Sequence, residues 1–253
     1  MPRNSSETKL EMHASEPLYK QVEKRILQCL AEGEWKPGDQ LPTENQLAER
    51  FGVAVFTIRG GIRDLAEANI LTRKQGKGTF VAKHTRQRQR YLFSRVFRND
   101  GTQIFPERKL LSFEREPASD EVTAILGLQK QERPMIFRIT GLLTVDEDPA
   151  STLDIMVPTK MFQGLTARVI REGQENLYAV YQDVCGINVI RIQESVYGTN
   201  ARGSIARALK TAVNSPVLRV ERIAYTYNDI PVEFRIRHLD ATKYHYCCDE
   251  GSA

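Results

Sequence analysis

The chain has 253 residues, of which 41% are hydrophobic and 27% charged, and its formal net charge is +4. This length and apolar fraction suit a globular protein of one or two domains, and no stretch is long and apolar enough to predict a membrane span. Residues 1–16 lack the apolar core of a signal peptide, so we expect a disordered tail there. The cysteines show no paired spacing, which favours reduced thiols in the cytoplasm over a secreted disulfide framework: Cys29, Cys185, Cys247 and Cys248.

Charge is placed unevenly along the chain. Residues 17–90 carry 14 Lys or Arg against 8 Asp or Glu, whereas residues 91–253 carry 20 against 21. The excess of positive charge predicts that the first third binds nucleic acid. This part ends in a basic stretch without apolar periodicity, KHTRQRQR, which predicts a linker over residues 84–90. Its charges favour a solvated connector over an arm that contacts DNA.

Two helices are expected at the start of the basic part. Apolar spacing over residues 17–32 predicts a supporting helix that ends near Gly33. Thr43 and Gln46 have the spacing of a capping box, which predicts the start of a second, short helix. Gly52 supplies the left-handed residue that ends this helix and turns the chain.

A third helix and a two-stranded wing follow this turn. The helix is predicted over residues 55–68, with apolar residues on one face and arginines on the other. Strands are predicted at 70–74 and 79–81, joined by a basic loop that contains two glycines. Two helices joined by a tight turn, with arginines on the free face of the second, fit the major groove of DNA.

Five motifs follow one another in this part: PLY at 17–19, KPGDQLPTE at 36–44, LAERFGV at 47–53, TIR at 57–59 and QGKGTFV at 75–81. Their order resembles the winged helix-turn-helix domain of the GntR family of bacterial transcription regulators, which we place at residues 17–83. The resemblance implies a homodimer that binds double-stranded operator DNA. It also implies a repressor that works in the bacterial cytoplasm, on the nucleoid.

Several positions depart from the family pattern. Ala54 is a poor N-cap for the third helix, and Gly60 and Gly61 inside this helix each cost roughly 1 kcal/mol relative to alanine. We expect Gly60 on the exposed side, where a change to alanine would raise stability. Two interpretations stay open, an unusual operator or weakened operator binding.

The candidates for DNA contact combine polar residues with apolar residues that can touch thymine methyl groups. They are Thr43, Asn45, Val55, Phe56, Thr57, Arg59, Arg63, Gln75, Gly76 and Lys77.

From Tyr91 onward, strands alternate with short helices, which predicts an α+β domain. Strands are expected at 110–116, 135–145, 150–157, 189–197, 217–227 and 232–238, and helices at 117–127, 176–186 and 204–212. The motifs LGL at 126–128, DEDP at 146–149, SPVLRVERIAY at 215–225 and IPVEF at 230–234 resemble the UTRA domain. This resemblance implies a chorismate-lyase-like α+β fold and an effector-binding role over residues 91–248, as in the HutC branch of the family.

The effector itself is less defined. Relatives that bind sugar phosphates carry two arginines at the positions of Gly141 and Leu143 and a serine at that of Ile155, so a phosphosugar pocket of the common kind is not expected. Strict alternation places Glu233, Arg235 and Arg237 on one face of a strand. Together with Arg138 and Asp154, these residues are our candidates for binding a small anionic effector. The alternative is a solvated sheet face.

An enzyme is the alternative from another class. The sequence shows no set of nucleophile, base and orienting residue, and no phosphate-binding loop before a helix, so we predict no catalytic residues and no cofactor. His238 and His245 near the two C-terminal cysteines raise the idea of a metal site. Zinc sites normally show two spaced ligand pairs, so we predict no metal.

Overall fold

The computed structural model describes residues 16–83, 95–173 and 176–247. The chain divides into two compact units, Met1–Lys83 and His84–Ala253, and each is described by itself. The tail predicted over 1–16 lies outside the described residues except for Glu16, and so does the linker predicted over 84–90. Within the described chain, no helix is both long and apolar enough to cross a membrane.

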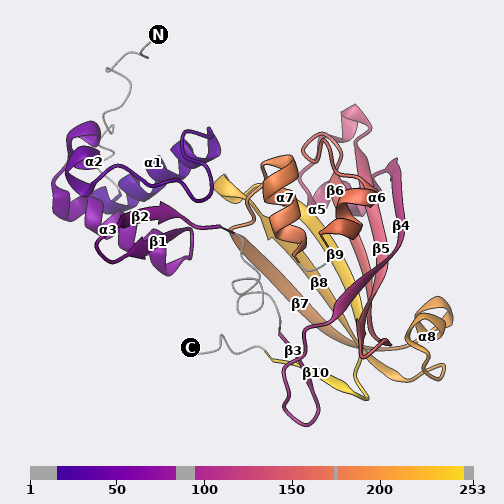
Figure 1. The fold of residues 1–253 in the computed structure, drawn as a ribbon. Helices are drawn as coiled ribbons and strands as arrows, with labels where there is room; N and C mark the ends of the chain where they lie inside the picture. Colours follow the sequence, from indigo (N-terminus) through magenta and orange to yellow (C-terminus); the bar gives the residue numbers. More distant parts are fainter. Residues whose placement is uncertain (1–15, 84–94, 174–175, 248–253) are drawn as a thin grey trace. The chain divides into compact units, whose positions relative to one another are not determined.

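The first unit has three helices followed by a two-stranded antiparallel wing (Figure 1): α1 Leu18–Ala31, α2 Glu44–Phe51, α3 Val55–Glu67, β1 Leu71–Lys74 and β2 Gly78–Val81. These bounds match the predicted elements to within a residue or two at their ends. The apolar stripes of the three helices meet in one core: Val22, Ile26, Leu47, Phe51, Ile58, Ile62 and Leu65.

The second unit is built on a six-stranded antiparallel sheet with the order β4-β5-β6-β9-β8-β7 (Figure 1). The strands are β4 Glu107–Pro117, β5 Met135–Val145, β6 Asp148–Pro158, β7 Arg191–Asn200, β8 Pro216–Tyr225 and β9 Pro231–Asp240. All six were predicted, although most are longer than the sequence patterns indicated. The α+β class is therefore confirmed.

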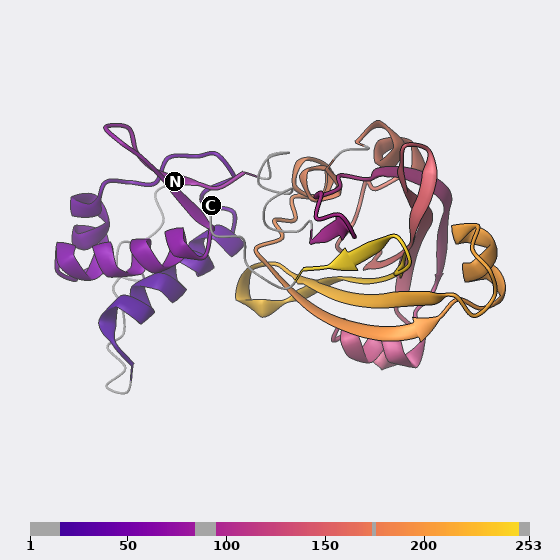
Figure 2. The same cartoon turned by 90° about the horizontal axis from the view of Figure 1, so that it is seen from below.

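Helices cover both faces of this sheet. The helices α6 Ala167–Glu172 and α7 Leu177–Cys185 pack on one face, which we call the inner face. The helix α5 Asp120–Ile125 packs on the opposite, outer face, as Figure 2 shows. A further helix, α8 Gly203–Leu209, packs its apolar side on the start of β8. Two short 3-10 turns, Lys130–Glu132 and Tyr227–Asp229, complete the connections.

Three elements were not predicted from the sequence. One is α6, and the others are β3 Val96–Arg98 and β10 Tyr244–Tyr246, which pair with each other as a two-stranded ribbon. The hairpin between β5 and β6 also differs, because its turn is Asp146-Glu147, both at positive φ. Asp148 and Pro149, which lie between the two strands predicted at 135–145 and 150–157, belong to β6 and pair with β5.

Candidate nucleic-acid interface and effector site

The predicted capping box fixes the start of α2, the first helix of the predicted helix-turn-helix. The Thr43 hydroxyl accepts a hydrogen bond from the backbone N–H of Gln46, and the Gln46 side chain accepts one from the backbone N–H of Thr43. Gly52 follows α2 in the left-handed conformation, at φ +70°. These two signals set the angle at which α3 leaves the turn.

The helix α3 buries Ile58, Ile62 and Leu65 and therefore presents its other side to solvent. Phe56 is 84% exposed, which is unusual for a phenylalanine and suits a residue that contacts another molecule. The N-cap residue Ala54 makes no side-chain cap hydrogen bond, as its side chain predicts.

Glu44, the first residue of α2, forms ion pairs with two arginines on the surface that carries the predicted DNA contacts. Arg59 on α3 donates from Nε to the Glu44 carboxylate at 2.6 Å, and Arg73 on β1 lies 3.6 Å from the same carboxylate. The bond to Arg59 uses Nε, so Glu44 does not occupy the terminal Nη pair, which makes bidentate contacts to a guanine edge. Arg73 was not among the sequence candidates.

The two glycines of α3 have a packing role that sequence reasoning missed. A Cβ atom at Gly61 would lie 2.8 Å from Val22 Cγ1 and 3.0 Å from the backbone oxygen of Tyr19, and one at Gly60 would lie 3.0 Å from Tyr19 Cβ. The glycines therefore let α1 and α3 approach closely. Gly60 is half-buried on the side of α3 opposite the core, and a side chain there would press on Tyr19, so a close contact opposes the gain in stability expected for alanine at this position.

A cleft of about 510 Å³ opens between the start of α1, the exposed side of α3 and the wing. It is lined by Leu18, Tyr19, Phe56, Thr57, Arg59, Gly60, Arg63 and Arg73. The cleft thus combines an exposed aromatic ring with three arginines on the surface that carries the predicted DNA contacts.

The wing presents its loop to solvent. Gly76 and Gly78 adopt φ angles of +69° and +107°, which glycine tolerates without strain. Gln40 donates to the backbone oxygen of Lys77 at 2.8 Å and so anchors the loop to the chain before α2. All ten predicted DNA contacts lie exposed or partly exposed in this unit: Thr43, Asn45, Val55, Phe56, Thr57, Arg59, Arg63, Gln75, Gly76 and Lys77.

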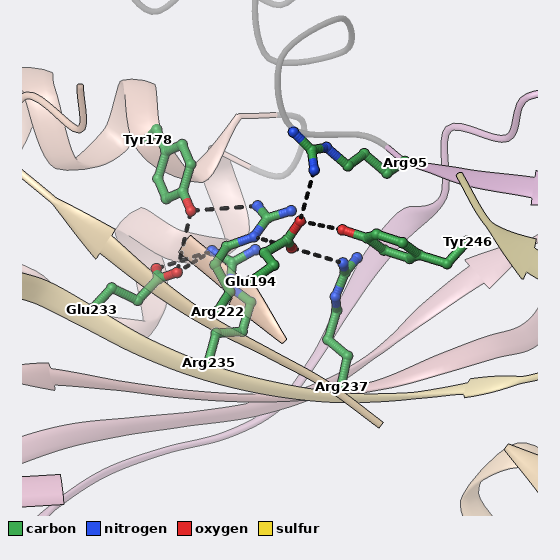
Figure 3. A network of polar contacts seen from close by, with 8 residues as sticks. All are labelled: Arg95, Tyr178, Glu194, Arg222, Glu233, Arg235, Arg237 and Tyr246. Carbon is green, nitrogen blue, oxygen red and sulfur yellow. Dashed lines mark hydrogen bonds and ion pairs between the residues drawn. The ribbon is translucent and has the colours of Figure 1, made fainter. Parts of the chain in front are cut away.

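In the second unit, a row of charged residues crosses the inner face of the sheet. Arg235 on β9 pairs with Arg222 on β8, and Arg222 pairs with Glu194 on β7. Cross-strand partners point to the same face, so these three side chains lie side by side. Arg237 and Glu233 flank Arg235 two residues away on either side and point the same way. Figure 3 shows this group, which we call the polar cluster.

One end of the polar cluster is centred on Glu233, which is fully buried. Its carboxylate accepts hydrogen bonds from Tyr181 at 2.7 Å, from Tyr178 at 3.3 Å and from Arg235 at 2.9 Å (Figure 3 draws those to Tyr178 and Arg235). Both tyrosines come from α7. The hydroxyl of Tyr178 also accepts from Arg222 at 3.5 Å, so it joins the two ends of the cluster.

The other end is centred on Glu194, whose side chain is 5% exposed. Arg222 donates from Nε to its carboxylate at 2.7 Å, and Arg237 lies 3.7 Å away. Tyr246 on β10 donates its hydroxyl to the same carboxylate, and Arg95 lies 3.9 Å from it (Figure 3). Burial alone would raise the pKa of Glu194, but Arg222 and Tyr246 outweigh it and hold that pKa below its ordinary value.

Positive charge is in excess in the polar cluster. Three buried guanidinium groups, those of Arg222, Arg235 and Arg237, face two buried carboxylates. Arg237 is 7% exposed, and its Nε and Nη2 make no hydrogen bond within the described part of the chain. Burial lowers the pKa of Arg237 to about 10, and the neighbouring Arg222 adds to this effect. The group stays charged at neutral pH, so its incomplete pairing is costly.

Arg138 and Asp154, the other two predicted effector residues, lie elsewhere. They form a bidentate ion pair, at 2.9 and 2.7 Å, in which Arg138 is about two-fifths exposed. Asp154 pairs with Ile236 on β9, whereas its neighbour Ile155 pairs with Arg235. Asp154 therefore points to the outer face, and the structure does not bring this pair together with Glu233, Arg235 and Arg237.

The three positions at which the sequence resemblance would place phosphate ligands are apolar here. A Cβ at Gly141 would lie 2.6 Å from the backbone oxygen of Lys109, Leu143 packs against the core, and Ile155 is fully buried. Across from Leu143, Arg108 on β4 donates to the backbone oxygens of Ile170 and Gly173 at the end of α6. Burial lowers the pKa of this arginine.

The residues weighed for a metal site do not gather in the described part of the chain. Cys248 lies outside the described residues. Within those ranges, no group of three or more His, Cys, Asp or Glu side chains could hold an ion.

Sequence reasoning missed most of the partners in the polar cluster: Arg95, Tyr178, Tyr181, Glu194, Arg222 and Tyr246. One signal was available for Arg222, because it stands between Val220 and Ala224 at the apolar positions of its strand. A charged residue in such a series is either paired in the interior or functional. Glu194 carries the same signal, because it stands between Ile192 and Val196 on its strand.

Comparison with known proteins assigns both units. Residues 18–81 match the family model of bacterial regulatory proteins, gntR family, and residues 103–245 match that of the UTRA domain. The chain is 28% identical over 215 residues to the mannosyl-D-glycerate transport/metabolism system repressor MngR of Escherichia coli, covering 83% of this chain and 85% of that protein. It is 39% identical over 69 residues to the histidine utilization repressor of Klebsiella aerogenes, covering 27% of this chain and 29% of that protein.

Among solved structures, the second unit is similar to the ligand-binding domain of a putative GntR-family transcriptional regulator from Bordetella bronchiseptica. The TM-score is 0.58 with 28% identity, covering 63% of this chain and 98% of that one. The order of the two matched domains, a reading head followed by a UTRA domain, is the order expected from the sequence motifs. The chain therefore belongs to the GntR family of bacterial transcription regulators, in its HutC-type branch, with a UTRA domain as its second half.

Proposed function

We propose that the chain is a homodimeric repressor that is released from its operator when a small organic anion binds the polar cluster. It acts on the chromosome in the bacterial cytoplasm. Its parts are a winged helix-turn-helix domain over residues 17–83, a linker over 84–90 and an effector domain over 91–248. A dimer places two reading heads on a pseudo-palindromic site, which multiplies affinity and matches the symmetry of such operators.

The DNA contacts follow from the exposed side of α3 and from the wing. Arg59, held by Glu44, supplies the bidentate contact to a base, and Phe56 and Val55 lie against thymine methyl groups. Lys77 at the tip of the wing lies against the phosphate backbone, where it adds affinity without reading sequence.

The excess of buried positive charge is the observation that carries the effector assignment. A bound anion would neutralise that excess and would accept hydrogen bonds from Nε and Nη2 of Arg237. Forked guanidinium donors bind carboxylate, phosphate and phosphonate groups in the same way. One relative is named for mannosyl-D-glycerate, which is a carboxylate.

The effector assignment is tested by thermal unfolding of the full chain with a panel of organic acids, phosphates and phosphonates. A ligand at 100 times its Kd stabilises the folded state by about 2.7 kcal/mol, which is a readily measured shift. We expect at least one anion to stabilise the wild type. Arg237→Met should lose this shift, whereas Arg219→Met, which removes an arginine from the outer face of β8, should keep it.

Two outcomes would contradict the assignment. One is a neutral effector whose affinity does not change in Arg237→Met. The other is an anion that stabilises Arg237→Met and the wild type equally, because that anion would then bind outside the polar cluster.

A second candidate function is a paralogue with weakened operator binding. It is favoured by the missing cap at Ala54 and by the carboxylate of Glu44 next to Arg59. Selection of bound fragments from random DNA separates the two candidates. A palindromic consensus with nanomolar affinity supports the repressor, whereas weak binding without sequence preference supports the paralogue.

A further inference from the structure

The carboxylate of Glu194 has four polar partners, which is more than its place in the fold requires. It lies on the edge strand β7, yet its side chain is buried beneath Arg222, Arg237 and Tyr246. Four groups from four parts of the domain meet at this carboxylate: β8, β9, β10 and the residue before β3. Glu194 is therefore the point at which the polar cluster meets the β3–β10 ribbon.

The chemistry of this carboxylate is that of an effector's anionic group. It accepts from Arg222 Nε and attracts Arg237, the same donors that would bind a carboxylate or phosphate from solution. Two anions cannot both occupy these donors, because like charges a few ångströms apart repel each other strongly in a buried site. An incoming anion that binds between Arg222 and Arg237 must therefore compete with Glu194.

We propose that Glu194 occupies the place of the effector's anionic group in the effector-free protein, and that the effector acts by displacing it. This inference rests on the proposed function and adds its regulation. The ligand class is an organic molecule with a carboxylate, phosphate or phosphonate group, because each of these can replace the Glu194 carboxylate between Arg222 and Arg237.

Displacement of Glu194 also releases the ribbon. Tyr246 donates to Glu194 from β10, and Arg95 faces it from the residue before β3. The backbone N–H of Cys247 donates to the backbone oxygen of Arg95 at 2.9 Å, so the ends of the two strands are tied to each other. Arg95 stands near the start of the second unit, a few residues after the linker predicted over 84–90. The ribbon thus connects occupancy of the polar cluster to the start of the effector domain.

The test compares Glu194→Gln with Glu221→Gln in the full chain. Glu221 is the matched control, because it pairs with Arg219 on the outer face of the same sheet. Orthophosphate, methylphosphonate and acetate serve as probes, and their Kd values are measured by calorimetry. Removing the competing charge should tighten binding of the preferred probe by roughly tenfold or more, as expected when the binding-competent state becomes fully populated. Glu221→Gln should bind like the wild type.

A second readout follows the ribbon by hydrogen exchange. Amides of β3 and β10 should exchange faster in the wild type with saturating probe, and equally fast in Glu194→Gln without probe. Glu194→Asp keeps the charge but shortens the side chain by one methylene group. This variant preserves the buried ion pairs better than Glu194→Gln does. Amide exchange in β3 and β10 should become faster in Glu194→Asp as well, but by a smaller amount.

The outcomes separate this inference from the proposed function. If Arg237-dependent anion binding is seen in the wild type but Glu194→Gln binds equally or more weakly, Glu194 only orients the arginines and the displacement inference is wrong. Unchanged exchange of β3 and β10 on binding would also overturn it. If no anion binds either protein, the proposed effector class fails, and the inference fails with it.

Discussion

The two sites of this protein are built in different ways. The reading head takes its contacts from consecutive elements between Thr43 and Lys77, each fixed by signals next to it in the chain. The polar cluster takes its residues from β7, β8 and β9, with partners from α7, from β10 and from the residue before β3. It exists only when the strand register is correct. A site of the first kind follows from local sequence, whereas a site of the second kind requires the assembled sheet. The predictions below test this difference.

The largest effect is expected for Tyr181→Phe in the effector domain. The change removes a buried hydrogen bond to the charged Glu233 and should lower the free energy of unfolding by about 1.5–3 kcal/mol. Tyr225→Phe is the control, because its hydroxyl donates to Gln193 at the surface and its loss should cost less than about 0.5 kcal/mol. Urea unfolding measures both. Equal effects would mean that the buried network adds nothing to stability.

Close packing of helices predicts the next effect. Gly61→Ala would place a methyl group against Val22 and the backbone of Tyr19, and overpacking of this kind costs about 1–3 kcal/mol. Better helix propensity returns about 1 kcal/mol at most, so the variant should be less stable than the wild type. Gly60→Ala meets only the side chain of Tyr19 and should be affected less. A more stable Gly61→Ala in thermal unfolding would contradict the packing argument.

A change at the reading surface should leave the fold intact. Arg59→Ala removes the proposed bidentate base contact, which is worth about 1–3 kcal/mol, so operator affinity should fall by roughly tenfold or more. Arg207→Ala, which removes an exposed arginine from α8, serves as the control for the lost charge. Gel retardation on the selected operator measures both. Equal retardation of Arg59→Ala and wild type would remove Arg59 from the interface.

The smallest effect concerns the N-cap of α3. Ala54 already has the extended backbone of a cap, at φ −66° and ψ 147°, but no side-chain acceptor. Ala54→Ser should therefore stabilise the head by about 0.5–1 kcal/mol. Thr43→Ala at the start of α2 is the mirror change, and it should destabilise by a similar amount. If Ala54→Ser brings no gain in urea unfolding, local caps count for less in this head than we argue.

The sequence predicts the local features of the DNA-binding head better than it predicts the polar cluster. Thr43, Gln46 and Gly52 were predicted with their roles, because caps act within a few residues. Alternation along β9 also placed Glu233, Arg235 and Arg237 on one face. Other parts of the site depend on pairing between strands, which a single sequence does not show.

Three cases illustrate this limit. Asp154 points away from Arg235 because its neighbour Ile155, one residue along, is the one that pairs with Arg235. Glu194 meets Arg222 only through the register of β7 with β8. The strands β3 and β10 have three residues each and lie far apart in sequence, so no periodicity reveals them.

The most direct test of the account follows release of operator DNA by fluorescence anisotropy. The selected operator is bound to the full chain and titrated with the anion that binds tightest in the thermal unfolding panel. We expect the wild type to release the DNA as the anion saturates. Arg237→Met should stay bound over the same range, although its affinity for DNA without anion is unchanged. Release from both proteins at the same concentration would show that the polar cluster does not receive the effector, and it would contradict the central claim.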